Sequence, residues 1–325
     1  MFGIIPKTPF AINNDHADIY YQSQHMFFKN RNIKSVTFYG DLDRFSNVSY
    51  MFDGCEQLVS VPELNFPRAT DASSMFCGCS SITGIIITFM PCVVDADFMF
   101  YHCKRLTVVQ AKNIEKLEKA TRMFAVCESL CFVDLGSVPS LEKAIYMFSD
   151  CPSLITVKMN NLQSLTNAEY MFLNCTSLRC IILGALPSLK DTTCMFSGCI
   201  TLVDITLSDI PKLKRAMEMF KDCISVERVS IGSTPELEHT YCMFNNCLSL
   251  KEVEFTNLSK LKDASWMFDG CSNVKSIKLG SLPNLKCADC MFRNCSSLQL
   301  LKYTDAYYIK DKRGMFYNCP LKGPN

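Results

Sequence analysis

Apolar residues recur along this chain with a fixed period of 24 residues. From Met26 onward the dipeptide Met-Phe occurs thirteen times, and from Met51 to Met315 each copy follows the previous one by 24 residues. The step from Met26 to Met51 is 25 residues. A fixed period of this size indicates one small structural unit stacked on copies of itself. The pattern predicts a repeat solenoid of about 12–13 repeats.

Each repeat carries two local patterns, numbered here as offsets from its methionine. Phe is at offset +1, Cys at +4, and aliphatic residues are at +7, +10 and +12. Around +10 to +12 the apolar residues alternate with variable ones, as at Val157 and Met159, which predicts a short half-buried strand. From +18 to the next Met-Phe pair the apolar spacing is three to four, as at Leu165, Ala168 and Met171, which suits a helical or 3₁₀ turn.

One such unit cannot bury its own apolar side chains, so neighbouring repeats must bury them. Strands of successive repeats are expected to stack in parallel about 4.8 Å apart. The expected fold is therefore a parallel β-sheet with short helical or 3₁₀ turns on the opposite side, and with the Met-Phe pairs in the core. The expected domains are an N-terminal cap at residues 1–25, a solenoid at 26–302 and a C-terminal cap at 303–325.

The chain has 20 cysteines, and 12 of them lie at the same repeat position, offset +4. The first repeat has Asn30 there instead, and either side chain can hydrogen-bond the backbone of a turn. Because Cys follows the repeat like any other interior residue, we expect free, buried thiols and no disulfide scaffold. Free thiols favour folding in a reducing cytoplasm.

The overall composition excludes several classes of protein. The net charge is +1, which disfavours a charge-driven nucleic-acid binder or an electrostatic membrane anchor. No apolar stretch approaches 18 residues, so no membrane insertion is expected. The segment from Met1 to Thr8 lacks the features of a signal peptide. Display on a surface or a virion would then require a non-classical route.

Residues with catalytic or metal-binding chemistry do not cluster in the sequence. The four histidines share no repeat offset, which disfavours a Cys-His or Ser-His-Asp arrangement. Cys287 and Cys290 have a metal-like spacing, but no second pair lies at a matching distance. We therefore expect a protein that is not an enzyme, with no cofactor and no metal site.

The run Met-Phe-x-x-Cys-x-Ser-Leu-x-x-Val-x-Leu resembles the BspA-type leucine-rich repeats of bacterial and protist surface proteins. Met147 to Leu154 and Met291 to Leu298 are good examples, and the match covers about nine-tenths of the chain. The resemblance implies a leucine-rich-repeat horseshoe or solenoid used for adhesion and recognition, without catalysis.

Residues at offsets +9 and +11 are expected to point outward from the strands, because +10 and +12 point inward. These positions vary freely between repeats and would form one continuous sheet face. We expect a protein or glycan partner to bind there. The candidate contact residues are Phe132, Asp134, Lys158, Ile182, Asp204, Arg228, Ser230, Glu252, Glu254 and Lys278.

The sequence thus predicts a recognition or adhesion protein that binds a macromolecule through an extended repeat surface. One alternative is a structural component of a virion or other assembly, such as a phage tail or surface protein, joined through the ends of the solenoid. A metal-binding or enzymatic protein is the second alternative, and the residue pattern disfavours it.

Overall fold

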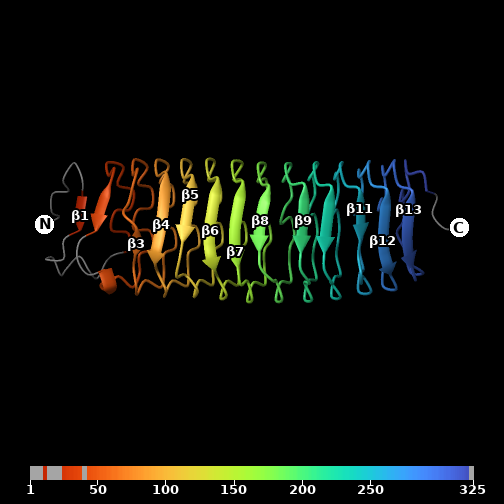
Figure 1. The fold of residues 1–325 in the computed structure, drawn as a ribbon, viewed down its shortest axis with the longest axis horizontal. Coiled ribbons are helices and arrows are strands. Elements are labelled where there is room, and N and C mark those ends of the chain that lie inside the picture. Colours follow the sequence, from red (N-terminus) through yellow and green to blue (C-terminus); the bar gives the residue numbers. More distant parts are fainter. Residues whose placement is uncertain (1–9, 13–23, 39–41, 322–325) are drawn as a thin grey trace. The chain divides into compact units, whose positions relative to one another are not determined.

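The computed structural model describes residues 10–12, 24–38 and 42–321. The chain forms two compact units, Met1–Leu162 and Gln163–Asn325. Both are built from short parallel strands that recur once per repeat (Figure 1). In the described residues regular helix is confined to one 3₁₀ turn, η2 (Leu42–Arg44). The fold is a parallel β-solenoid with a repeat of about 24 residues, as the sequence predicts.

Strands of the first unit follow one another in chain order. They are β1 (Phe10–Ile12), β2 (Val36–Phe38), β3 (Leu64–Asn65), β4 (Gly84–Phe89), β5 (Val108–Ala111), β6 (Phe132–Ser137) and β7 (Thr156–Asn160). Strand β1 pairs in parallel with β2, and β3 to β7 form a run of parallel neighbours. The predicted cap at 1–25 lies largely outside the described residues.

The second unit continues the same pattern. Its strands are β8 (Cys180–Leu183), β9 (Asp204–Leu207), β10 (Arg228–Ile231), β11 (Glu252–Glu254), β12 (Ser276–Ser281) and β13 (Leu300–Thr304). Strands β9 to β13 form a five-stranded sheet in chain order. Across β9 and β10, Ile205 pairs with Val229, and across β11 and β12, Val253 pairs with Ile277. Each pair is 24 residues apart, so the sequence period fixes the register of the sheet.

The core consists of identical side chains aligned from repeat to repeat. Met99 and Phe100 are 1% and 0% exposed, and the Met-Phe pairs of the other internal repeats are equally buried. The ring of Phe100 stacks on Phe76 with centroids 5.6 Å apart and on Phe124 at 5.3 Å. Offsets +10 and +12 also point inward, as the alternating burial of β5 and β9 shows. The predicted inward face of the strands is confirmed.

The side opposite the sheet is made of successive single turns. Within one repeat, the Tyr101 amide donates to the Phe98 carbonyl over 3.0 Å, which closes a turn. The preceding amide, that of Phe100, donates instead to the Met123 carbonyl of the next repeat, over 2.8 Å. Phe98 and His102 adopt left-handed backbone conformations, with φ near 60°. The short turns predicted here are therefore present, but the left-handed residues stop each from extending into a helix.

These turns form a second ladder between repeats, on the side away from the sheet. The same alternation recurs through both units, with left-handed residues just before each Met and at offset +3. Offset +3 is mostly Gly, Asn or Asp, which tolerate this conformation. The position before Met also holds larger residues, for example Tyr146 and Trp266. Their strain of about 1–2 kcal/mol each is offset by the backbone hydrogen bonds between repeats.

The repeated cysteine joins neighbouring turns. The Cys127 thiol donates to the Phe100 carbonyl over 3.1 Å, and that carbonyl also accepts the Cys103 amide at 3.2 Å. The same thiol bond to the preceding repeat is made by Cys55, Cys79, Cys103, Cys151, Cys199, Cys223, Cys247, Cys271 and Cys295. In the first repeat, Asn30 Oδ1 accepts the Asn32 amide at 3.1 Å. All 20 cysteines are free.

Truncation of one ring in the phenylalanine column is expected to destabilise the first unit. Phe100→Ala removes a fully buried ring and leaves a cavity, so the free energy of unfolding should fall by about 3–5 kcal/mol. Phe89→Ala, at a side chain that is 41% exposed, should change it by less than about 1 kcal/mol. Urea unfolding followed by circular dichroism measures both values. Equal effects of the two substitutions would contradict the stacked core.

Candidate binding face of the sheet

The ten candidate contact residues all lie on the outward face of the strands. Phe132, Asp134 and Lys158 belong to β6 and β7 of the first unit. The other seven belong to β8 through β12 of the second unit. Each side chain is exposed or half-buried, while its strand neighbours at offsets +10 and +12 face the core. The structure therefore places these residues at the surface, three in the first unit and seven in the second.

The first-unit group forms a loosely connected part of the face. The Lys158 ammonium lies 5.5 Å from the centre of the Phe132 ring, a cation–π contact. The Asp134 carboxylate accepts the Gly136 amide at 3.1 Å, so it is held against its own strand. Strand pairing places Asp134 beside Lys158.

An apolar area on β4 and β5 was not among the sequence candidates. Ile86 is 47% exposed and Val108 is 38% exposed, although both lie at strand positions that face outward. They border a hollow of about 340 Å³ that is also lined by Val61, Glu63 and Gln110. Ile86 is at offset +11 and Val108 at offset +9, the offsets of the predicted contact residues. Listing the residues at these two offsets in the earlier repeats would have found both.

The second-unit group carries two ion pairs between adjacent strands. Arg228 Nη2 lies 2.9 Å from Asp204 Oδ2, and Lys278 Nζ lies 2.7 Å from Glu254 Oε2. The Asp204 carboxylate raises the pKa of the Arg228 guanidinium, and that of Glu254 raises the pKa of Lys278. These pairs are exposed, so solvent screens them and they add little to the stability of the fold. They mainly hold long side chains in defined positions.

Between these ion pairs the face is hollowed, and we call this feature the charged hollow. Its volume is about 340 Å³. Its rim is formed by Asp204, Arg228, Glu252, Glu254 and Lys278, and its floor by Thr206, Ser230 and Ser276 with the strand backbone. The hollow exists because short hydroxyl side chains lie next to long charged ones at the outward offsets of neighbouring strands. Ile182, on β8, is 49% exposed but does not line it.

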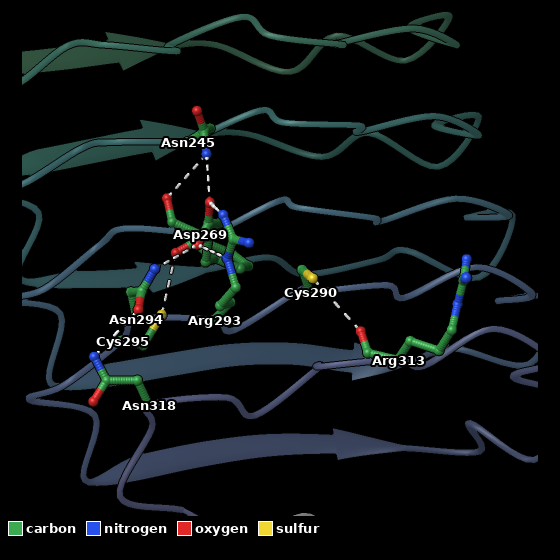
Figure 2. A network of polar contacts seen from close by, with 9 residues as sticks. Asn245, Asp269, Cys290, Arg293, Asn294, Cys295, Arg313 and Asn318 are labelled. Atoms are coloured by element: carbon green, nitrogen blue, oxygen red, sulfur yellow. Dashed lines mark hydrogen bonds and ion pairs between the residues drawn. The ribbon is translucent and has the colours of Figure 1, made fainter.

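A separate polar cluster on the turn side has a structural explanation. Arg293 binds both carboxylate oxygens of Asp269, at 2.8 and 2.9 Å, and the amides of Asn245 and Asn294 complete the shell at 3.1 and 3.2 Å (Figure 2). The guanidinium also lies 4.2 Å from the Trp266 ring centre. Because Asp269 is buried and saturated with donors, this cluster links three repeats and offers no open site.

The two cysteines with metal-like spacing are not part of a larger cluster of metal-ligating side chains in the described residues. No group of three or more His, Cys, Asp or Glu side chains in the described ranges could hold a metal ion. Cys287 and Cys290 are half-buried free thiols, and the Cys290 thiol donates weakly to the Arg313 carbonyl at 3.6 Å (Figure 2). None of the described helical segments is long and apolar enough to cross a membrane.

The repeat geometry and the column of cysteines define a leucine-rich-repeat solenoid. The model of the BspA type leucine rich repeat region matches residues 96–217 and 192–322, which together cover more than half of the chain. The chain belongs to this family. Residues 21–134 also match a family described as a Mycoplasma protein of unknown function, DUF285. No curated protein matches the chain.

Several solved structures are similar to this chain at low identity. A leucine-rich cell surface protein from Faecalibacterium prausnitzii is 17% identical, with a TM-score of 0.32, over 87% of this chain and 83% of that one. A leucine-rich repeat protein from Eubacterium ventriosum is 14% identical, with a TM-score of 0.34, over 97% and 90%. A TLR13 chain solved with single-stranded RNA is 15% identical, with a TM-score of 0.38, over 92% of this chain. This chain covers only 49% of the TLR13 chain.

Thiol reactivity should separate the exposed cysteine of the sheet face from the core column. Burial raises the pKa of the Cys223 thiol to about 12, so at pH 8 roughly one thiol in ten thousand is ionised. Cys180 is exposed on β8 and should react with iodoacetamide first, whereas Cys223 should react only on unfolding. Peptide mass spectrometry locates the label, and Cys180→Ser should remove the fast phase. Rapid labelling of Cys223 in the folded chain would contradict the buried column.

Proposed function

We propose that this protein recognises a protein partner through the outward face of its parallel sheet. Proteins built from leucine-rich repeats generally act in protein interaction or adhesion, which sets the class of function. The observation that carries the proposal is the charged hollow, with its ordered rim of Asp204, Arg228, Glu254 and Lys278. A rigid sheet holds these groups at fixed spacing, so little conformational entropy is lost when a partner binds.

The face suits a macromolecule better than a small substrate. Its hollows are shallow and open, and the candidate residues extend over successive strands of each unit. Small-molecule sites are usually deep and enclose most of the ligand. The first unit adds exposed apolar side chains at Ile86 and Val108, a combination typical of surfaces that bind proteins. A glycan partner would use mainly the polar part.

Assembly through the C-terminal end of the second unit is a second candidate. Tyr307, Tyr308 and Tyr317 are 81%, 68% and 67% exposed. Two of them, Tyr307 and Tyr317, line a hollow of about 850 Å³ beside the last strand. Exposed tyrosines are enriched in protein interfaces, so this region favours a role as a subunit of a larger structure.

Charge reversal on the sheet face is expected to weaken partner binding. A variant with Glu252→Lys and Glu254→Lys keeps the core intact but reverses two rim charges. A partner is first isolated by pull-down with the wild-type protein and identified. It is then purified and titrated against each variant by calorimetry. We expect the dissociation constant of the double variant to be at least tenfold larger, since mismatched charges at an interface are strongly unfavourable.

The matched control is Glu236→Lys. Glu236 is also partly exposed and forms an ion pair with Lys260, but it lies outside the strands. Its partner affinity should stay within about twofold of the wild type. If the double variant also binds normally, the sheet face is not the binding surface. Loss of binding on Tyr307→Ala and Tyr317→Ala alone would favour the C-terminal end instead.

A further inference from the structure

We propose that the charged hollow binds a basic side chain, lysine or arginine, presented by the protein partner. This inference rests on the proposed function, because it specifies the chemistry that the sheet face recognises. It starts from Glu252, which lines the hollow from the central strand β11 and makes no side-chain hydrogen bond or ion pair to any described residue. The neighbouring charged groups of the rim are engaged in pairs.

The other four charged residues of the rim form two ion pairs, so Glu252 is the rim carboxylate without an ion pair. Asp204 is bound to Arg228 on the adjacent strand, and Glu254 is bound to Lys278 on the other side. Strand register places Glu252 directly between Arg228 and Ser276. Arg228 is therefore near Glu252, but its guanidinium makes its hydrogen bond to Asp204. Ser276 is too short to compete for the carboxylate.

The net charge of the rim determines whether a positively or a negatively charged group is favoured in the hollow. Three carboxylates, those of Asp204, Glu252 and Glu254, face two cations, Arg228 and Lys278, so the rim has a net charge of −1. An incoming cation would meet one unpaired carboxylate and two others close by. An incoming carboxylate would meet the same excess negative charge and no free cation. The hollow therefore complements a basic group.

The floor of the hollow adds room and further acceptors. Ser230 and Ser276, together with Thr206, are short, so a long side chain can reach the strand surface between the rim groups. Their hydroxyl oxygens can accept hydrogen bonds from a guanidinium or an ammonium group. A planar guanidinium can bind a carboxylate with two parallel hydrogen bonds, which makes arginine the better fit of the two.

The test uses the full chain and defined small probes, since the partner is not needed. N-acetyl-arginine amide is titrated at low salt while the backbone amide signals of Ser230, Val253 and Glu254 are followed by NMR. N-acetyl-citrulline amide is the matched probe of nearly the same shape without the charge. We expect saturable shifts at these three amides with the arginine probe, and at least about fivefold weaker binding of the citrulline probe.

The variant Glu252→Gln should weaken binding of the arginine probe at least about fivefold, because it removes the free negative charge and keeps the shape. Glu236→Gln, at an ion pair outside the strands, should bind the probe as the wild type does. Absence of saturable shifts, equal binding of both probes, or unchanged binding by Glu252→Gln would overturn the inference. The proposed function fails separately, when the variant with Glu252→Lys and Glu254→Lys still captures its partner normally.

Discussion

Hydrogen bonding between neighbouring repeats at a constant separation of about 24 residues is the constraint on which this structure depends. It acts on two sides of each repeat. On the sheet side, parallel strands pair in register, as between Val109 and Val133. On the turn side, alternate amides donate to the next repeat, as from Phe100 to Met123. A backbone fixed on both sides leaves identical side chains aligned in the core.

This arrangement explains how a conserved interior and a variable surface coexist within each repeat. The Met, Phe and Cys positions contact the same positions of adjacent repeats, so a change in one is felt by two neighbours. The outward strand positions contact only solvent and each other. They carry apolar residues at Ile86 and Val108, but charged ones at Arg228 and Glu252. The outward residues can therefore change without a change of fold.

Much of the fold could be predicted from the sequence, because the period is strict and the strand pattern is local. The inward positions, the buried free cysteines and the outward face all follow from the offsets, as at Val157 and Lys158. The turns could be predicted only in part. Residues such as Phe98 and Trp266 in left-handed conformations have no sequence signal, since their strain is offset by contacts with another repeat.

The outward face of the sheet was predictable as a row of positions but not as a shaped surface. Which side chains pair depends on geometry across strands, so the ion pairs of Asp204 and Glu254, and the free carboxylate of Glu252, required the structure. The Asp269 cluster was likewise not predictable from the sequence, because its four polar contacts come from adjacent repeats. Polar networks of this kind are set by spatial neighbours that no single repeat encodes.

Precise removal of one repeat tests the stacking account most directly. Deletion of residues 220–243 joins Met219 to Phe244, restores the Met-Phe pair and removes 24 residues. Deletion of residues 220–231 removes only 12 and leaves a 12-residue step between Met219 and Met243, so the repeats on the two sides of this junction cannot stack in register. Thermal unfolding followed by circular dichroism should show a cooperative transition for the first variant, and a less cooperative transition at lower temperature for the second. Equal loss of the transition in both would contradict a solenoid held together by contacts between equivalent positions.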